Sequence, residues 1–484
     1  MRNISGNLTM LVDFYEITMG NGYLKCGMKD TVTYFDVFYR SNPDGGGYAI
    51  AAGLEQIIDY INDLHFTEAN IEFLRKKGIF SEEFLNYLKD FKFTGDMWAI
   101  PEGTVVFPNE PLITVKAKAT EAQFIETYIL MELNHQSLIA TKASRITRLA
   151  EGRPVSEFGS RRAQGANAAI YGARAAYIGG CSSTACAISD ELFGVPATGT
   201  MAHSWVQMFD DEYTAFKNYC QIYPNNAVLL IDTYNVLKSG LPNAIKAFDE
   251  VLKPLGVTKC AVRLDSGEIT YLSKKVRKAL DAAGWTDCKI IASNSLDEYI
   301  IRDLIRQGAQ VDSFGVGERL ITSKSQPVFG GVYKLVAVED KAGNIIPKIK
   351  LSENVGKITT PHFKKLYRIK NKDNGKAEAD LICIHDEELD FTKPIELFDP
   401  EHTWKRKTFE EYTAVELLVP IFEGGKQVYK CPSLEEIKQH CKEELEETWE
   451  EILRFENPHN YYVDLSEKLW NVKNELLKTQ GKKK

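Results

Sequence analysis

The chain is 484 residues long, with 44% hydrophobic and 26% charged residues and a formal net charge of −8. Its length predicts two or three domains, and its composition is that of a globular protein rather than a disordered one. The negative charge argues against a general nucleic-acid binder, although a locally basic pocket for a small anion is compatible with it.

The N-terminus and the cysteines indicate the compartment. Residues 1–15 mix charged and amide side chains with apolar ones, so they lack the apolar core of a signal peptide and the length of a membrane span. The cysteines are odd in number and lie in apolar surroundings, as at Cys220 and Cys260. This pattern favours buried free thiols in a reducing cytosol over a disulfide framework. We therefore expect a cytoplasmic protein without membrane or nucleic-acid partners.

Residues 1–150 predict an α+β domain. A helix is expected over residues 8–25, and the β-branched and aromatic run 31–39 predicts a strand that ends at Arg40, before a glycine-rich turn. Further helices are expected at about 51–64 and 82–91, short strands within 97–116, and a closing helix over 121–149.

Residues 151–335 alternate short apolar segments with helical stretches. The seven strand candidates are 155–158, 180–182, 197–200, 228–231, 260–264, 290–293 and 313–316. Repeated βα units predict parallel strands. Nearly every polar side chain with catalytic potential follows one of these strands, and in a (β/α) barrel those strand ends meet on one face. We therefore expect an α/β barrel rather than an open doubly wound sheet.

Residues 336–484 predict a C-terminal extension packed on the other two domains. Strands are expected near 334–351 and 367–385, and charged helices over 433–455 and 465–477. The cysteines and histidines of this region are Cys383, His385, His402, Cys431, His440 and Cys441. They lack a paired Cys-x-x-Cys spacing, so scattered structural residues are favoured over a zinc site.

The last two strand ends predict a phosphate site. Gly315 and Gly317 would leave backbone amides free to face a phosphate, and Ser293 and Asn294 add side-chain donors from the neighbouring strand. The alternative for the two glycines is ordinary turn chemistry.

Arginines and an aspartate follow two other strands. Arg161 and Arg162 at one strand end, and Arg263 at another, suit planar recognition of a carboxylate or phosphate, with a rim ion pair as the alternative. Asp265 could hold ribose hydroxyls or a Mg²⁺ carried by a diphosphate. It could equally cap the helix that begins near Glu268.

His203 lies just past the third strand candidate. Asp232, at the next strand end, could accept a hydrogen bond from one imidazole nitrogen and leave the other nucleophilic or basic. A lone histidine is more often structural, but the position of His203 among these strand ends favours catalysis. Together the strand ends predict chemistry on a phosphorylated sugar.

Six segments, in chain order, resemble the nicotinate phosphoribosyltransferase family. They are 11–19 (LVDFYEITM), 35–40 (FDVFYR), 157–162 (EFGSRR), 199–204 (GTMAHS), 263–267 (RLDSG) and 314–317 (FGVG). The resemblance implies an irregular seven-stranded (β/α) barrel with an N-terminal α+β domain, in a homodimer whose sites lie between one subunit's barrel and the other's N-terminal domain. The implied reaction converts nicotinate and phosphoribosyl pyrophosphate to nicotinate mononucleotide and pyrophosphate, in NAD salvage. ATP hydrolysis would be coupled to it through a phosphohistidine.

The resemblance also implies a role for each site residue. The nicotinate residues would be Tyr15 of the partner subunit and Phe158 around the ring, with Arg161, Thr200 and Arg263 around the carboxylate. The phosphoribosyl residues would be Asp265 at the ribose hydroxyls near a substrate-borne Mg²⁺, Ser293, Asn294, Gly315 and Gly317 at the 5′-phosphate, Thr322 more loosely, and Arg40 at the pyrophosphate across the interface. His203 would be the phosphorylated histidine, oriented by Asp232. No metal ligand set is expected from the protein itself.

The absence of an acidic residue at the second strand end helps to decide between substrates. Nicotinamide-using relatives commonly carry an aspartate at the second strand end, whereas residues 180–184 contain no acid. A carboxylate substrate would be repelled by an aspartate there, so nicotinate is favoured. The alternatives are a nicotinamide phosphoribosyltransferase of the same fold and a non-catalytic sensor of phosphoribosyl pyrophosphate.

Overall fold

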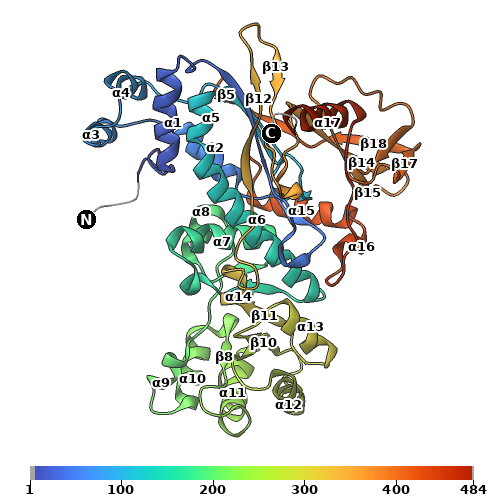
Figure 1. Cartoon of the computed structure of the whole chain (residues 1–484). Coiled ribbons are helices and arrows are strands. Elements are labelled where there is room, and N and C mark those ends of the chain that lie inside the picture. The colour runs from blue at the N-terminus through green and yellow to red at the C-terminus, as the bar shows by residue number, and fades with distance from the viewer. Residues whose placement is uncertain (1–5, 482–484) are drawn as a thin grey trace. The chain divides into compact units, whose positions relative to one another are not determined.

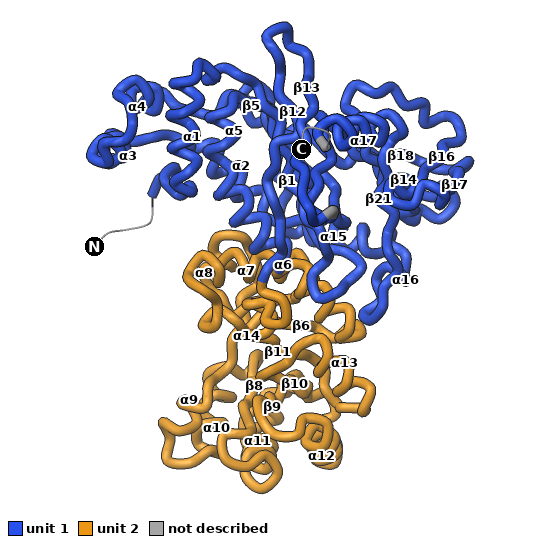
Figure 2. Tube along the Cα trace, viewed as in Figure 1, with its two compact units in different colours: residues 1–138, 328–484 blue, residues 139–327 orange. Residues whose placement is uncertain are grey.

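The computed structural model describes residues 6–481 (Figure 1). The chain divides into two compact units, one formed by the described residues up to 138 together with those from 328 onward, the other by residues 139–327 (Figure 2). The predicted N-terminal domain and C-terminal extension fall mainly in the first unit, and the predicted barrel domain falls mainly in the second. The three-domain division stays a prediction.

An antiparallel seven-stranded sheet forms the centre of the first unit, in the order β13-β12-β1-β5-β3-β19-β20. Its strands are β1 (Val32–Phe38), β3 (Asp96–Ala99), β5 (Ile113–Lys118), β12 (Val332–Glu339), β13 (Ile345–Pro347), β19 (Val419–Glu423) and β20 (Lys426–Gln427). β-Branched and aromatic side chains fill β1 and suit a strand that is buried on both faces. The sheet joins segments from both ends of the chain, because β1 pairs with β12 as well as with β5.

Helices and a short strand pair complete the N-terminal part of this unit. They are α1 (Phe14–Lys25), α2 (Leu54–Asn62), α3 (Glu68–Lys76), α4 (Glu82–Lys89), α5 (Ala119–Phe124), β2 (Ala49–Ile50) and β4 (Val105–Val106). The apolar faces of α2 and α4 lie in the same buried cluster as the central strands, which explains the apolar spacing of both helices. Helix α6 (Glu126–Leu149) follows and contributes residues to both units.

The C-terminal part of the first unit has a four-stranded sheet, in the order β18-β14-β15-β21. The elements are β14 (Lys364–Asn371), β15 (Ala377–Ile384), β16 (Ile395–Phe398), β17 (Arg406–Phe409), β18 (Tyr412–Glu416), β21 (Val463–Leu465), α15 (Leu434–Glu447), α16 (Glu450–Leu453) and α17 (Glu467–Gly481). The buried Arg368 guanidinium on β14 pairs with Asp380 and Glu444, both at 2.7 Å. This network ties α15 to the sheet.

A parallel sheet forms the second unit, in the order β7-β6-β11-β10-β9-β8. Its strands are β6 (Val155–Glu157), β7 (Ser183–Thr184), β8 (Val228–Leu230), β9 (Ala261–Leu264), β10 (Lys289–Ser293) and β11 (Ser313–Val316). Its α-helices are α7 (Ala166–Ile178), α8 (Ala187–Phe193), α9 (His203–Gln207), α10 (Glu212–Ile222), α11 (Leu241–Ala247), α12 (Ile269–Ala282), α13 (Glu298–Arg306) and α14 (Glu318–Ile321). The predicted mixed α/β class is confirmed.

The expected closed ring of seven strands is not established by backbone hydrogen bonding. Of the candidate 197–200, only Ala197 pairs, through an isolated parallel bridge to Thr184. Within the described part of the chain, no ladder joins this segment to β8. Pro196 and Gly199 flank or interrupt it, and both residue types weaken strand pairing. The sheet therefore has six laddered strands, with the third candidate attached at one point.

None of the described helices is both long and apolar enough to cross a membrane.

Candidate active site

A cavity of about 380 Å³ lies beyond the carboxyl ends of the parallel strands in the second unit. The predicted site residues that line it are Phe158, Arg161, Thr200, His203, Arg263, Asp265, Ser293, Asn294, Gly315 and Gly317. Parallel strands bring their carboxyl ends to one edge, so residues far apart in sequence meet here. The structure thus gathers most of the predicted site in one place.

His203 is the first residue of α9 and is partly exposed to the cavity. Its Nδ1 lies 3.1 Å from the hydroxyl oxygen of Thr233, and its Nε2 lies 3.9 Å from a carboxylate oxygen of Asp265. The imidazole therefore has a hydroxyl on one side and a carboxylate on the other. Within the described part of the chain, this geometry leaves Nε2 without a close hydrogen bond.

The expected hydrogen bond between Asp232 and His203 is absent among the described residues. Asp232 instead accepts hydrogen bonds from the backbone amide of Asp265 at 3.0 Å and from the hydroxyl of Ser266 at 2.5 Å. These contacts turn its carboxylate toward the loop after β9. Its other oxygen is buried and has no hydrogen-bond partner in the described chain. Thr233, the next residue, takes the place beside the imidazole that was predicted for Asp232.

Asp265 is fixed by its neighbours rather than by the helix that follows. The hydroxyl of Ser293 donates a hydrogen bond to one of its oxygens, and the other oxygen faces His203. The N-cap of α12 is Glu268, whose carboxylate accepts from Thr270, so the helix-capping alternative for Asp265 is wrong. Its carboxylate remains about one-third exposed and available to a ligand.

Arg263, on β9, connects the laddered strands to the segment that follows the third strand candidate. It donates hydrogen bonds to the hydroxyl of Thr200 at 2.8 Å and to the carbonyl oxygen of Met201 at 2.9 Å. Its Nε is buried without a hydrogen-bond partner among the described residues. Burial lowers the pKa of this guanidinium, and the nearby carboxylates of Asp265 and Asp232 oppose that effect. An arginine in this environment is ready to accept an anionic group.

Phe158 depends on a glycine for its position. A Cβ atom on Gly315 would lie 2.5 Å from the Phe158 ring, far inside contact distance. The backbone amide of Phe158 also donates to the carbonyl of Val316 at 2.8 Å. Gly315 is therefore required by the ring beside it, in addition to any role for its own amide.

The turn after β6 is held by a buried acid. Glu157 is fully buried and accepts hydrogen bonds from the Thr184 hydroxyl at 2.7 Å and from the amide of Gly159. Burial raises the pKa of this carboxyl group. Glu157 thereby fixes the loop that carries Phe158 and Arg161, a role that its place in the sequence did not reveal.

Two adjacent residues at the end of β10 have left-handed backbone conformations, Asn294 with φ 74° and Ser295 with φ 54°. Non-glycine residues in this region are uncommon and are enriched at functional sites. Both residues line the cavity.

Sequence reasoning missed two basic residues of the cavity, Arg319 and Lys324. Arg319 pairs with Asp297, the N-cap of α13, and Lys324 pairs with Glu318 at 2.8 Å. Glu318 also lies 3.8 Å from Arg162. The signal was available in sequence, because both residues follow closely on the Gly315–Gly317 turn.

Comparison with known proteins identifies the family. Residues 10–134 match the model of the nicotinate phosphoribosyltransferase N-terminal domain, and residues 363–473 match that of its C-terminal domain. Nicotinate phosphoribosyltransferase of Bacillus subtilis (strain 168) is 43% identical over 469 residues, which cover 96% of this chain and 94% of the relative. The chain belongs to the nicotinate phosphoribosyltransferase family.

Other members of the nicotinate phosphoribosyltransferase family agree over nearly the whole chain. Nicotinate phosphoribosyltransferase pncB2 of Mycobacterium tuberculosis (strain ATCC 25618 / H37Rv) is 36% identical, covering 95% of this chain and 92% of the relative. The crystal structure of human nicotinic acid phosphoribosyltransferase has a TM-score of 0.83 and 27% identity, covering 96% of this chain and 99% of the human one. The family fold therefore extends over both units.

Four residues implied by the family resemblance lie outside the cavity lining: Asp232, described above, and three others. Tyr15, on α1, and Arg40, after β1, belong to the first unit. Burial, followed by the charge of Glu126, raises the pKa of Tyr15. Thr322 follows α14, and its hydroxyl donates to the carbonyl of Glu318 at 2.7 Å. Their predicted roles remain predictions.

The family resemblance implies a Mg²⁺ carried by the substrate, and the acidic side chains of the cavity are its candidate ligands. Among the described residues there is no cluster of three or more His, Cys, Asp or Glu side chains that could hold a metal ion. Asp265, which lines the cavity and is about one-third exposed, offers carboxylate oxygens of the kind that Mg²⁺ prefers. Asp232 does not line the cavity.

Proposed function

We propose that this protein transfers the phosphoribosyl group of phosphoribosyl pyrophosphate to nicotinate, giving nicotinate mononucleotide and pyrophosphate. Membership of the nicotinate phosphoribosyltransferase family supports this activity. The observation that carries the site assignment is the cavity that places Arg263, Asp265 and His203 together at the strand ends. A role in NAD salvage follows from the reaction.

The chemistry needs positioning and charge stabilisation more than a strong base. The pyridine nitrogen of nicotinate carries no proton, so it forms the new bond to C1′ with its own lone pair while the C1′–oxygen bond to pyrophosphate breaks. Positive charge develops at C1′ and negative charge on the leaving group. Arg161 and Arg263 would hold the nicotinate carboxylate, with Thr200 beside them and the ring against Phe158. Asp265 would hold the ribose hydroxyls.

The 5′-phosphate would lie at the ends of β10 and β11. Ser293, Asn294, Gly315 and Gly317 supply hydroxyl, amide and backbone donors around one part of the cavity, and Thr322 would contact the phosphoribosyl group more loosely. Mg²⁺ carried by the diphosphate would lie near Asp265. When bound, it would neutralise charge on the pyrophosphate.

ATP coupling through His203 is a further part of the proposal. The bare imidazole nitrogen would attack the γ-phosphorus of ATP as the bond to ADP breaks, and the other ring nitrogen would give up its proton to solvent. Later hydrolysis of the phosphohistidine would release phosphate. The free edge of the imidazole, with Asp265 3.9 Å from Nε2, supports this assignment. Because Thr233 rather than Asp232 contacts Nδ1, we assign the orienting role to Thr233.

The architecture and assembly are also proposed. The sheet would act as an irregular seven-stranded barrel with residues 197–200 as the remaining strand, and the hydrogen bonds from Arg263 to Thr200 and Met201 support this. A homodimer would bring Tyr15 and Arg40 of the partner subunit to each site. The free thiols of all nine cysteines are consistent with a cytoplasmic location.

Product formation from phosphoribosyl pyrophosphate with nicotinate or nicotinamide, each with and without ATP, tests the proposal. We expect turnover of nicotinate, its enhancement by ATP, and its loss in Arg263→Ala. Turnover of nicotinamide alone would overturn the substrate assignment. Binding of the sugar diphosphate with no turnover of either ring would favour a sensor.

A further inference from the structure

The helix turn that carries Tyr15 lacks an ordinary cap. Asp13 is the N-cap residue of α1, but its carboxylate makes no capping hydrogen bond. Glu16 is the third residue of the helix, a position where glutamate commonly accepts a hydrogen bond from the backbone amide of the N-cap residue. Residues 13–16 therefore have the spacing of a capping box, but neither of its two local hydrogen bonds forms among the described residues.

A threonine from another helix completes this cap. The backbone amide of Asp13 donates to the hydroxyl oxygen of Thr127 at 3.1 Å, and the same hydroxyl donates to Oε1 of Glu16 at 2.6 Å. The Thr127 oxygen thus lies between the two groups that would meet directly in a capping box. A hydroxyl can accept and donate at the same time, and this position uses both capacities.

Glu16 depends on this hydroxyl. Its side chain is fully buried, and its Oε2 has no hydrogen-bond partner in the described chain. Burial raises the pKa of the carboxyl group to about 8. A buried polar group that loses a hydrogen bond is costly to keep in place. We therefore expect the first turn of α1 to shift when the Thr127 hydroxyl is removed.

Thr127 belongs to a well-packed part of the first unit. It is the second residue of α6, and the next residue, Tyr128, is buried. The Tyr128 ring stacks on Tyr60 of α2, with ring centroids 4.0 Å apart and an interplanar angle of 6°. Helix α1 also packs along α5, which leads into α6 (Figure 1). The hydroxyl is therefore a fixed point to which residues 13–16 are tied.

Tyr15 lies between the two tied residues. It is 45% exposed, so core packing does not hold its ring, and the backbone of residues 13–16 determines where the ring points. Burial, followed by the charge of Glu126, raises the pKa of the Tyr15 phenol, which places Glu126 close to it. The first two residues of α6 therefore face consecutive residues of α1.

We propose that Thr127 is a positioning residue for nicotinate. Its hydroxyl fixes the first turn of α1 and thereby the Tyr15 ring, which in the proposed homodimer reaches the second-unit cavity of the other subunit. This inference rests on the proposed function, because it needs both the reaction and the role of Tyr15 in it. Thr127 itself touches no substrate and acts through the backbone of residues 13–16.

Steady-state kinetics of the full-length protein test this role, with nicotinate and phosphoribosyl pyrophosphate varied in turn. Thr127→Val keeps the shape of the side chain but removes both hydrogen bonds. We expect it to raise the KM for nicotinate roughly tenfold, a factor within the range of two lost hydrogen bonds. The KM for phosphoribosyl pyrophosphate should stay near the wild-type value. A cap with a purely structural role would lower the amount of active enzyme, and hence kcat, without raising one KM alone.

Three variants control for the hydroxyl and for folding. Thr127→Ser restores the hydroxyl and should return the KM for nicotinate to near the wild-type value. Thr120→Val makes the same change on α5, where the Thr120 methyl group lies near Gly20 of α1 and its hydroxyl makes no hydrogen bond to residues 13–16 in the described chain. It should leave the KM unchanged. Thr127→Ala removes the hydroxyl with less bulk and provides the same test if the valine variant does not fold.

A double-mutant cycle with Tyr15→Ala shows whether Thr127 acts through Tyr15. Once the ring is absent, Thr127→Val should not raise the KM for nicotinate further. An unchanged KM in Thr127→Val, or an equal rise with and without the Tyr15 ring, would overturn this inference alone. An unchanged KM in Tyr15→Ala would also overturn the role of Tyr15. Absence of nicotinate turnover by the wild-type protein would overturn the proposed function itself.

Discussion

Replacing Thr233 by valine tests how His203 is oriented. Valine keeps the shape of threonine but removes the hydroxyl that lies 3.1 Å from Nδ1 of His203. A hydrogen bond of this kind contributes about 0.5–1.5 kcal/mol, and because the imidazole is 40% exposed, water replaces part of it. We therefore expect a loss of about 0.5–1 kcal/mol, which corresponds to a roughly two- to fivefold smaller ATP stimulation.

The assay compares nicotinate turnover with and without ATP and measures acid-labile phosphate on the protein. Thr233→Val should reduce ATP stimulation and phosphohistidine formation while leaving turnover without ATP unchanged. Thr233→Ser, which restores the hydroxyl, should recover both. Wild-type stimulation in the valine variant would refute the role of Thr233, and an equal loss in both variants would show that packing rather than the hydroxyl matters.

Three further predictions concern packing and ionisation, and the first has a matched control. Gly315→Ala should displace the Phe158 ring and raise the KM for nicotinate roughly tenfold, whereas Gly199→Ala, whose added methyl meets no atom within 4 Å, should have little effect in the same steady-state assay. Lys364 and Asp36 form a buried ion pair at 2.7 Å. Lys364→Met leaves the Asp36 carboxylate without its cation and should cost about 3–5 kcal/mol of stability in denaturant titration. Burial raises the pKa of Glu16 to about 8. The protonated side chain therefore stabilises the fold fully below the unfolded pKa near 4.5, and this contribution is lost as pH rises through 8. In Glu16→Gln, the melting temperature should change less with pH over that range.

The sequence was sufficient to predict which residues gather at the carboxyl ends of the parallel strands. Asp265 follows one short strand and Gly315 lies in the last two residues of another, and a repeated βα pattern forces such positions to the same side of a parallel sheet. This inference needs only the strand positions and their direction. It does not depend on side-chain packing, which is why it holds for segments as far apart as β6 and β11.

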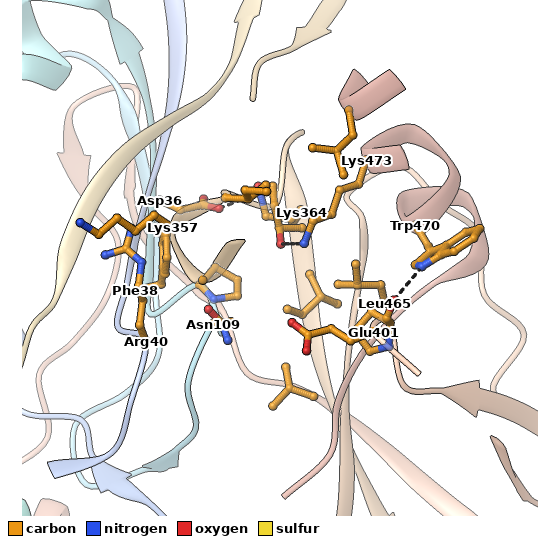
Figure 3. Close-up of a pocket in the computed structure, with 18 of the residues that line it drawn as sticks. Asp36, Phe38, Arg40, Asn109, Lys357, Lys364, Glu401, Leu465, Trp470 and Lys473 are labelled. Carbon is orange, nitrogen blue, oxygen red and sulfur yellow. Dashed lines mark hydrogen bonds and ion pairs between the residues drawn. The ribbon is translucent and has the colours of Figure 1, made fainter. Parts of the chain in front are cut away.

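Side-chain orientation could not be predicted in the same way. Asp232 and Thr233 are adjacent, and only the conformation of the loop after β8 determines which of them meets the imidazole. A cavity of about 540 Å³ within the first unit was not predicted, for another reason (Figure 3). It is lined by β1 and by α17, which lie more than four hundred residues apart, and no local pattern indicates that the two segments are neighbours.

The neighbour of His203 Nδ1 is the Thr233 hydroxyl and not the predicted Asp232 carboxylate, and this difference has a chemical consequence. A carboxylate can only accept a hydrogen bond, so it would hold the proton on Nδ1. The Thr233 hydroxyl can accept from Nδ1–H or donate to the bare nitrogen. Either nitrogen can then lose its proton while the imidazole keeps its position. In the proposed phosphohistidine cycle the imidazole ring loses a proton when it is phosphorylated and regains one when the group leaves, so a partner that serves both states would suit the role proposed for His203.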